Sequence, residues 1–277
     1  MTSFIYELSG WPEFHWDDRR VIGPLADVRH CQGKLLGRMG GLGFNLRAEA
    51  DLKALTAEVV KSSAIEGERL DTEEVRSSIA RRLGMDVAGK KTPGRRVEEI
   101  VGMMLDATRG YSKPLTAERL FAWHASLFPT GYSGMHKIRV GQWRSEEIGA
   151  MQVVSGPIGR ERVHFVAPAA SRLEQEMERF LSWFADGGKI DPVLKAGVAH
   201  LWFVTIHPFE DGNGRIARAI TEMALARAEG TGQRFYSMST RIEAERAAYY
   251  HALERSQRGT LNIIHWLEWF LECSGGR

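Results

Sequence analysis

The chain has 277 residues, of which 43% are hydrophobic and 26% charged, with a formal net charge of +2. This composition is typical of a globular protein with one large domain, or a core with an added subdomain. The even charge balance does not favour nucleic-acid or membrane partners. Two distant cysteines, Cys31 and Cys273, exclude a disulfide framework. Because no secretory signal or membrane span is indicated either, a cytoplasmic location is expected.

The sequence pattern changes near Asp51. Residues 1–25 are rich in aromatic side chains without a clear period, which predicts an irregular extension packed on a helical body. From Asp51 onward, apolar residues recur at three- and four-residue spacing, which indicates a helix. Ser62 and Glu66 continue the same stripe, where a core helix should carry apolar side chains, and Gly67 offers a helix end.

Further helix signals follow along the chain. Asp71 and Glu74 indicate a capping box that opens a short helix, and the basic loop 90–96 marks a candidate subdomain boundary. Asp191-Pro192 predicts the start of an apolar helix that ends near Ile206. Additional helices are expected at 120–127, 173–184, 216–223, 241–257 and 263–271.

One segment favours strands. Met151–Val154 and Arg162–Phe165 are rich in β-formers and flank a turn with glycines at both ends, Gly156–Gly159, which predicts a β-hairpin. The expected fold class is therefore all-α, a helical bundle with one small β-hairpin.

The most informative stretch is His207–Arg218, which reads His-Pro-Phe-Glu-Asp-Gly-Asn-Gly-Arg-Ile-Ala-Arg. Pro208 cannot easily continue the preceding helix, so His207 is expected at a helix-to-loop corner. Histidine titrates near neutrality and is a natural base for a hydroxyl group. The position and the chemistry together favour His207 as a general base.

The second half of this stretch predicts an anion site. Gly212 and Gly214 allow the main chain to approach a ligand, and the next helix points its first N–H groups into the loop. Arg215 and Arg218 lie three apart, hence on one helix face, and suit a polyphosphate. Asp211 suits a Mg²⁺ ion that bridges phosphates.

Each of these residues also has a structural explanation when taken alone. His207 could cap a helix, Asn213-Gly214 could form a hairpin turn, and Arg218 could pair with Glu222. Phe209 is expected to be a buried anchor of the loop. The joint occurrence of so many constrained positions favours the functional interpretation.

The stretch matches the Fic family motif, His-Pro-Phe-x-(Asp/Glu)-Gly-Asn-Gly-Arg-x-x-Arg, at every specified position. This resemblance implies a Fic fold and transfer of AMP from ATP to a Tyr, Ser or Thr hydroxyl of a target protein, or of the chain itself. It further implies that His207 deprotonates that hydroxyl and that Asp211 holds Mg²⁺ on the α- and β-phosphates. No membrane or nucleic-acid partner is expected, and a homodimer is left open.

The resemblance also implies a nucleotide pocket. Asn213 is implied at the α-phosphate, Arg215 at the β-phosphate and Arg218 at the γ-phosphate. Tyr250 and Gln257, seven apart on one helix face, are similar to residues that line the adenine pocket, although a core role for the tyrosine is an alternative. The residues assigned to the nucleotide are Phe209, Gly212, Asn213, Gly214, Arg215, Arg218, Tyr250 and Gln257.

The hairpin, residues 149–166, resembles the flap that binds an extended target segment by strand addition; an alternative is a hairpin that only covers the core edge. The flap residues assigned to target docking are Met151, Gln152, Val153, Val154, Val163 and His164.

The expected divisions are an extension (1–50), a region with an inhibitory motif (51–90), a Fic core (97–230) and C-terminal helices that complete the pocket (231–277).

Residues Ser62–Gly67 match the family's inhibitory pattern, (Ser/Thr)-x-x-x-Glu-(Gly/Asn), in the class with an N-terminal inhibitory helix. Ser62 and Glu66 share a helix face, so the Glu66 carboxylate could pair with Arg218 and deprive the γ-phosphate of its partner. The alternative is a solvated glutamate near a helix end. Whether Glu66 also activates water to remove AMP from a modified target stays open.

Competing functions remain at this point. Fic proteins also transfer UMP, phosphocholine or phosphate, but the phosphate-transferring variant has lysine where this chain has Gly214. A metal-dependent hydrolase could use His200, His207 and Asp211, and the hairpin could serve a non-catalytic interaction module.

Residues from Phe4 to about Phe44 resemble a segment that precedes the Fic core in a bacterial subgroup. Many of that subgroup continue into a winged-helix module; either this module is absent here or the sequence is a shortened form, so DNA binding is not expected of this chain.

Overall fold

A computed structural model describes residues 4–85, 91–156 and 160–275. This part of the chain forms eleven α-helices and two small antiparallel hairpins, so the prediction of a mostly helical fold with a hairpin is confirmed. The second hairpin, β1 (Tyr132–Ser133) and β2 (His136–Lys137), was not expected. Strands of two residues are too short to leave a period in the sequence.

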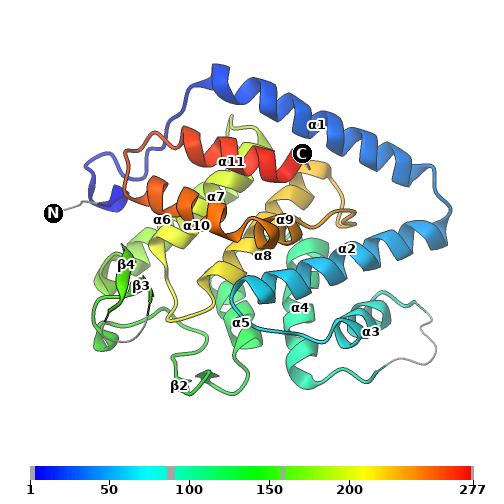
Figure 1. The fold of residues 1–277 in the computed structure, drawn as a ribbon, viewed down its shortest axis with the longest axis horizontal. Coiled ribbons are helices and arrows are strands. Elements are labelled where there is room, and N and C mark those ends of the chain that lie inside the picture. The colour runs from blue at the N-terminus through cyan, green and yellow to red at the C-terminus, as the bar shows by residue number, and fades with distance from the viewer. Residues whose placement is uncertain (1–3, 86–90, 157–159, 276–277) are drawn as a thin grey trace.

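Two central helices carry the core of the bundle, α7 (Pro192–Ile206) and α8 (Asn213–Glu229) (Figure 1). The predicted start of α7 is confirmed, because the Asp191 side chain accepts a hydrogen bond from the Val193 N–H. Nearly all residues of α7 are buried, which explains its continuous apolar sequence. The loop between α7 and α8 contains the first half of the His207–Arg218 motif, and the first turns of α8 contain the second half.

The other helices surround this pair, and their bounds are α4 (Arg95–Arg109), α5 (Ala117–Leu127), α6 (Leu173–Ala185), α9 (Met238–Ala244), α10 (Arg246–Gln257) and α11 (Ile264–Gly275). Three short 3-10 helices are η1 (Ile5–Glu7), η2 (Glu146–Ile148) and η3 (Ala170–Arg172). The stretch 241–257 is helical as expected, but it is divided between two helices. Glu245 leaves the helical region at φ −113° and ψ 33°, and separates α9 from α10.

The N-terminal region is more regular than expected. Helix α1 (Asp18–Gly40) runs beside α11, and α2 (Phe44–Ile65) returns toward the centre of the molecule (Figure 1). The expectation of an irregular segment up to residue 25 is therefore wrong from Asp18 onward. Few residues of α1 are buried, so its packing face is too narrow to give a clear apolar period.

Helix α3 (Thr72–Arg82) starts where the sequence predicts, but its cap differs from the prediction. Asp71 accepts hydrogen bonds from the Glu73 and Glu74 N–H groups, as an N-cap residue does. The Glu74 carboxylate accepts from Gly94 N–H and so links α3 to the start of α4. The predicted capping box is thus half formed.

Buried polar contacts fasten α2 to the core. The Asp51 carboxylate accepts from the Arg234 N–H at 2.9 Å and pairs with the Arg109 guanidinium. About two turns further along, the Glu58 carboxylate accepts from the Ser239 N–H at 3.0 Å. Asp51 and Glu58 are each 2% exposed, so breaking these contacts would leave charges without partners in the interior.

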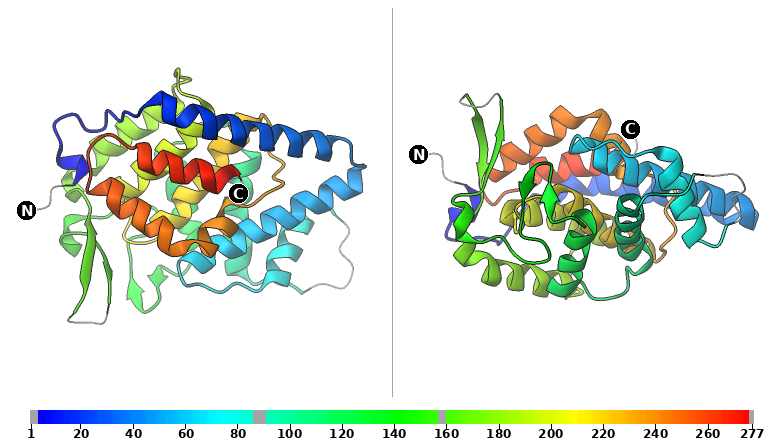
Figure 2. Two further views of the ribbon diagram at one scale, coloured as in Figure 1. Left: turned by 45° about the horizontal axis from the view of Figure 1, so that its top comes forward. Right: turned by 90° about the horizontal axis from the view of Figure 1, so that it is seen from below.

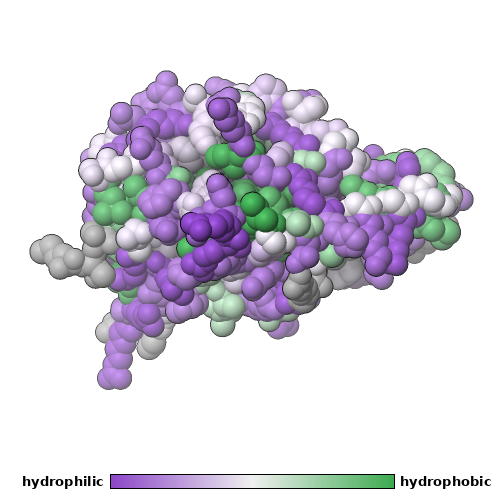
Figure 3. Space-filling model, turned by 90° about the horizontal axis from the view of Figure 1, so that it is seen from above, coloured by the Kyte–Doolittle hydropathy of each residue, from purple (hydrophilic) through white to green (hydrophobic). Residues whose placement is uncertain are grey.

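The surface on the α1 side is mostly hydrophilic, with several separate apolar patches (Figure 3). One lies at the corner between α1 and α2, where Leu42, Phe44 and Leu46 are 37%, 80% and 63% exposed. Within residues 4–85, 91–156 and 160–275, no helix has both the length and the apolar character needed to cross a membrane. Both cysteines are unpaired.

Candidate functional site

His207 occupies the corner where α7 ends. Its backbone lies in the left-handed region at φ 52° and ψ 58°, and it is the only non-glycine residue with positive φ in the described part of the chain. Such a conformation is unfavourable for a side-chain-bearing residue and is often found at functional sites. The ring Nδ1 lies 3.2 Å from the Val204 carbonyl oxygen, which can only accept, so Nδ1 carries the proton. In the neutral ring, Nε2 is then the basic nitrogen.

Arg144 holds this corner in place, a role that the sequence did not reveal. Its Nε donates to the His207 carbonyl at 2.8 Å, and its backbone N–H donates to the Pro208 carbonyl at 2.9 Å. The side chain also donates to the Pro168 carbonyl, at the base of the predicted flap, and is 3% exposed. Arg144 therefore connects the His207 corner to the predicted flap.

Replacing Arg144 by methionine is expected to lower the turnover of the active site about tenfold. The substitution removes the two donors that fix the His207 carbonyl and Pro168, and small displacements of a reacting group are costly. Because Arg144 does not touch the α8 N-terminus, nucleotide affinity should stay within twofold. Rates and nucleotide affinities of Arg144→Met, measured in a chain with Glu66→Gly, check this; a larger loss of affinity than of rate would contradict it.

The motif loop is braced from inside by Asn213 and His124. The Asn213 amide donates to the Phe209 carbonyl at 2.8 Å, and its oxygen accepts from the Phe209 N–H at 3.0 Å. The His124 ring stacks on Phe209 at 4.2 Å, and its Nε2 lies 3.2 Å from the Asp211 carbonyl. Phe209 is fully buried, as the anchor role predicts. The Asn213 side chain is thus committed to the loop, which leaves its backbone N–H as the group for a phosphate.

Burial keeps three histidines neutral. Loss of hydration lowers the pKa of His207 and of His124 to about 4, and the pKa of His200 to about 3. His200 contacts the Thr221 and Tyr249 hydroxyls at 2.9 Å each. It is therefore a structural residue, and the described residues contain no group of three metal-binding side chains. The arrangement that a His200–His207–Asp211 hydrolase would need is not formed.

These depressed values predict an acid-sensitive fold. In the unfolded chain each histidine binds a proton below about pH 6.5, whereas His124 and His200 stay neutral in the folded chain until about pH 4 or lower. The free energy of unfolding should therefore fall by about 2 kcal/mol for each of these two residues between pH 7 and pH 5. Urea unfolding at both pH values checks this, and His200→Gln should remove one such contribution. An unchanged pH dependence in that variant would contradict the assignment.

The N-terminus of α8 forms an anion cradle that Glu66 fills. Gly212 precedes the helix at φ 82°, and a Cβ on Gly214 would lie 2.2 Å from the Glu66 Oε1, so only glycine leaves room for this carboxylate. The Arg218 guanidinium donates to the same Oε1 at 2.8 Å and to the Ser62 hydroxyl at 2.9 Å. Arg218 is 2% exposed. The contact expected between Glu66 and Arg218 is present.

Gly67 lets the chain reverse after this carboxylate. It adopts φ 81° and its N–H donates to the Ala64 carbonyl, as in a glycine-terminated helix. Arg215 pairs with the next residue, Glu68, at 2.8 Å, and its guanidinium lies 4.9 Å from the Phe128 ring centre. Two buried donors, Arg218 Nη1 and Arg215 Nε, have no partner in the described part of the chain. Such unpaired donors fit an anionic ligand better than the present contacts.

Asp211 is the carboxylate available to a metal ion in this loop. Its side chain is 43% exposed, accepts from the Ser133 hydroxyl of β1, and lies 3.8 Å from an Arg215 nitrogen. Mg²⁺ commonly takes one or two carboxylates and completes its shell with phosphate and water oxygens. The donors therefore fit a Mg²⁺ ion that arrives with a polyphosphate, without a three-residue protein site.

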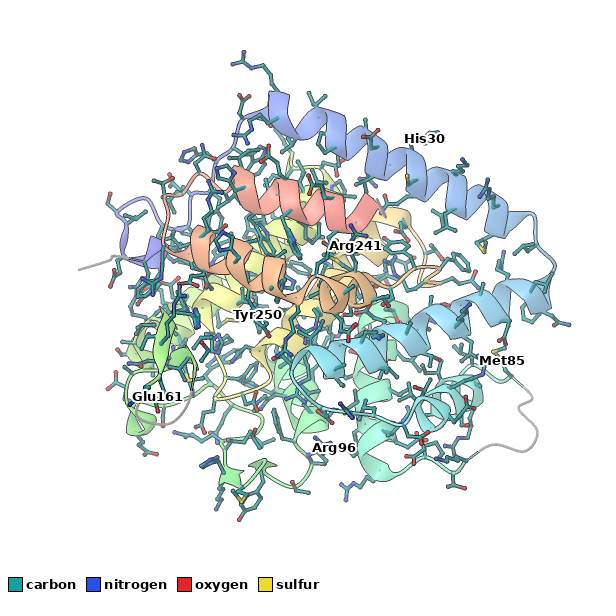
Figure 4. The ribbon with its side chains drawn as sticks, viewed as in Figure 1. His30, Met85, Arg96, Glu161, Arg241 and Tyr250 are labelled. Atoms are coloured by element: carbon teal, nitrogen blue, oxygen red, sulfur yellow. The ribbon has the colours of Figure 1, made fainter. Side chains whose placement is uncertain are left out.

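Tyr250 and Gln257 both lie on α10, but in different surroundings. Tyr250 is 37% exposed (Figure 4), and burial together with the nearby Glu66 carboxylate raises the pKa of its hydroxyl. Gln257 is 5% exposed and its amide donates to the Thr205 hydroxyl at 3.3 Å, near the end of α7. The structure therefore places Tyr250 near Glu66 and the anion cradle, and Gln257 beside the end of α7, close to His207.

The predicted flap is formed by β3 (Gln152–Ser155) and β4 (Arg162–Val166), which project from one end of the bundle (Figure 2). Val154 pairs with Val163, and both side chains are exposed. Arg258, which directly follows α10, donates to the Val163 and His164 carbonyls of β4. The flap residue Met151 precedes β3, and its carbonyl accepts from the Ala167 N–H. Part of the predicted turn, 157–159, lies outside the described residues.

Comparison with known proteins finds two family models that match parts of the chain. A model described as the Fic/DOC family matches residues 114–225, which include α7, the motif loop and most of α8. Residues 114–225 thus form a Fic/DOC domain. A second model, described as a domain of unknown function (DUF4172), matches residues 4–85, which contain α1, α2, the Glu66 turn and α3.

Two animal relatives illustrate the similarity of this Fic chain to curated proteins. It is 28% identical over 205 residues to "Protein adenylyltransferase fic-1" of Caenorhabditis elegans, a match that covers 73% of this chain and 37% of the relative. It is 26% identical over 216 residues to "Protein adenylyltransferase Fic" of Nematostella vectensis, covering 73% and 43%. The chain thus spans about two fifths of the length of these relatives.

Solved structures of similar shape establish the Fic fold. A Fic family protein from Desulfovibrio desulfuricans superposes with a TM-score of 0.66 at 23% identity, covering 95% of this chain and 74% of the other. A Fic-domain-containing signalling protein from Bacteroides thetaiotaomicron gives 0.65 at 20% identity, covering 90% and 93%. The predicted Fic fold with a small hairpin is confirmed.

Proposed function

We propose that this Fic protein transfers AMP from ATP to a hydroxyl side chain of a target protein and that Glu66 restrains it. One observation carries the proposal: a carboxylate lies in the helix N-terminal cradle, over Gly214 and 2.8 Å from Arg218. Such a cradle binds anions, so the carboxylate stands where a phosphate would bind. The names of the animal relatives support the same activity.

The nucleotide would enter as Glu66 leaves. Arg218 and Arg215 already carry unpaired buried donors that a polyphosphate could use. The N–H groups at the start of α8 would hold the α-phosphate, and Tyr250 would contact the base. Asp211 would hold Mg²⁺, which would neutralise charge on the phosphates when bound. The functional divisions expected from the sequence are retained, with the brake in 51–90 and the catalytic core in 97–230.

His207 would act as the base. Its Nε2 takes the proton of the target hydroxyl while the hydroxyl oxygen attacks the α-phosphorus. The bond from that phosphorus to the oxygen bridging to the β-phosphate breaks, and pyrophosphate leaves with the electron pair. Burial favours the neutral imidazole that this step needs. The catalytic effect would come from positioning and charge stabilisation.

The target would dock on the flap. The outer edge of β4 is held by Arg258, so an extended target segment would add to β3, beside the exposed Val154 and Val163. The target is another protein or a second copy of this chain. Self-association would use the apolar corner formed by Leu42, Phe44 and Leu46, and a reducing compartment such as the cytoplasm suits the unpaired cysteines.

A nucleotide panel tests this function. The Glu66→Gly chain is incubated with Mg²⁺ and ATP, UTP or CDP-choline, each labelled on the phosphate that would be transferred, and protein-bound label is counted. We expect label from ATP at least tenfold above label from the other two. Stronger label from UTP or CDP-choline would identify a different Fic transferase. Absence of both binding and labelling for all three would overturn nucleotide chemistry and leave an interaction module.

A further inference from the structure

A second carboxylate, Glu68, lies beside the anion cradle and is not explained by the Glu66 contact. One oxygen of Glu68 is 2.8 Å from Arg215 and the other is 2.7 Å from Arg96. Arg96 lies in the first turn of α4 (Figure 4). The side chains of Glu68 and Arg215 are 14% and 6% exposed, whereas Arg96 is 60% exposed. Glu68 thus bridges one buried and one exposed arginine.

The geometry pairs the two motif arginines with two carboxylates of the same turn. Arg215 and Arg218 lie three apart on α8, and Glu66 and Glu68 lie two apart around Gly67. The positive φ of Gly67 reverses the chain, so that both carboxylates reach α8. Removing Glu66 alone would therefore free Arg218 and leave Arg215 occupied.

We propose that Glu68 is a specificity-determining residue. It weakens the binding of nucleotides that have two or three phosphates, relative to nucleoside monophosphates. Its carboxylate competes with the second phosphate of a nucleotide for Arg215. A nucleoside monophosphate, with one phosphate in the α8 cradle, does not need Arg215, so Glu68 leaves its affinity unchanged. This inference rests on the proposed function, because it assumes that the cradle binds a nucleotide.

Arg96 makes it feasible for a phosphate to replace Glu68 at Arg215. Separating a buried ion pair is costly if either charge loses its partner. Here the incoming phosphate would replace Glu68 at Arg215, while Glu68 would keep Arg96, which is exposed and can follow it. The exchange therefore leaves neither charge unpaired. Arg96 thus determines how easily Glu68 releases Arg215.

The test measures binding of AMP, ADP and ATP by calorimetry to the full chain with Glu66→Gly, with and without Glu68→Gln. Because Glu68 and Arg215 are in close contact, we expect ADP and ATP to bind about tenfold more tightly in the double variant. The affinity for AMP should change less than twofold. The ratio of ADP to AMP affinity is the decisive readout, since a merely structural role of Glu68 would alter both nucleotides alike.

Two further variants complete the test. Glu73→Gln removes an exposed carboxylate of α3 and should leave all three affinities unchanged. Arg96→Gln deprives Glu68 of its second partner, so ADP should bind about threefold more weakly relative to AMP. Equal changes for AMP and ADP, or weaker ADP binding with Glu68→Gln, would overturn this inference alone. Failure of all three nucleotides to bind the Glu66→Gly chain would overturn the proposed function as well.

Discussion

Replacing Glu66 by glycine is expected to raise ATP-dependent protein labelling by about a hundredfold. The Glu66 carboxylate lies over Gly214 and pairs with Arg218, so it would repel a phosphate that enters the cradle. Its removal would let the triphosphate settle with the α-phosphate beside His207. The measurement is the initial rate of label transfer from ATP labelled on the α-phosphate, with wild-type and variant at equal concentration.

Two controls separate charge from shape in this experiment. Glu66→Gln keeps the size of the side chain but removes the charge, and should give an intermediate rate because the amide still occupies part of the cradle. Glu73→Gln makes the same change of charge outside the site and should have no effect. Equal labelling by wild-type and Glu66→Gly chains, with ATP bound equally well, would show that Glu66 does not restrain the enzyme.

The change His207→Ala, made in the Glu66→Gly chain, is expected to lower the rate at saturating ATP by about 100- to 10,000-fold, the usual range for a general base. The imidazole carries its proton on Nδ1, which faces the Val204 carbonyl, so Nε2 is the nitrogen that the hydroxyl would meet. The affinity for ATP should change less than threefold, because the cradle is built from α8 rather than from this ring.

The same experiment separates catalysis from binding. Rates at saturating ATP and calorimetric affinities are measured together, with His200→Gln as the matched histidine control. His200 is buried between Thr221 and Tyr249, so its loss should lower stability and leave the rate per folded molecule within a few fold. A His207→Ala chain that transfers AMP at an undiminished rate would exclude His207 as the base.

The sequence predicted those helices that have a clear apolar pattern or a capping residue at the first turn. The apolar run of α7 with its Asp191 cap is an example. Helix α1 escaped notice because only Val21, Val28 and Gln32 are buried along its length. The break at Glu245 also left no signal, since neither proline nor glycine marks it.

The site was predicted where chemistry and spacing combine, and missed where contacts come from distant segments. The Glu66–Arg218 contact joins residues that two separate patterns had indicated. Glu68 carries no such pattern, because a lone charged residue in a loop resembles a solvated one. The Asn213 side chain faces the Phe209 backbone instead of the ligand, a distinction that depends on side-chain direction and not on sequence.

The buried contacts of Asp51 and Glu58 restrict the motions by which α2 could remove Glu66 from the cradle. Lifting the whole helix would separate Asp51 from Arg234 and Glu58 from Ser239, each pair almost fully enclosed. Turning the Glu66 side chain about its own bonds gives up its ion pair with Arg218 but leaves those two enclosed pairs intact, and the Glu66 side chain itself is 31% exposed. Access for a ligand therefore costs least when the motion is a local change of rotamer in the last turn, on the nanosecond scale of side chains and not the slower scale of helix displacement.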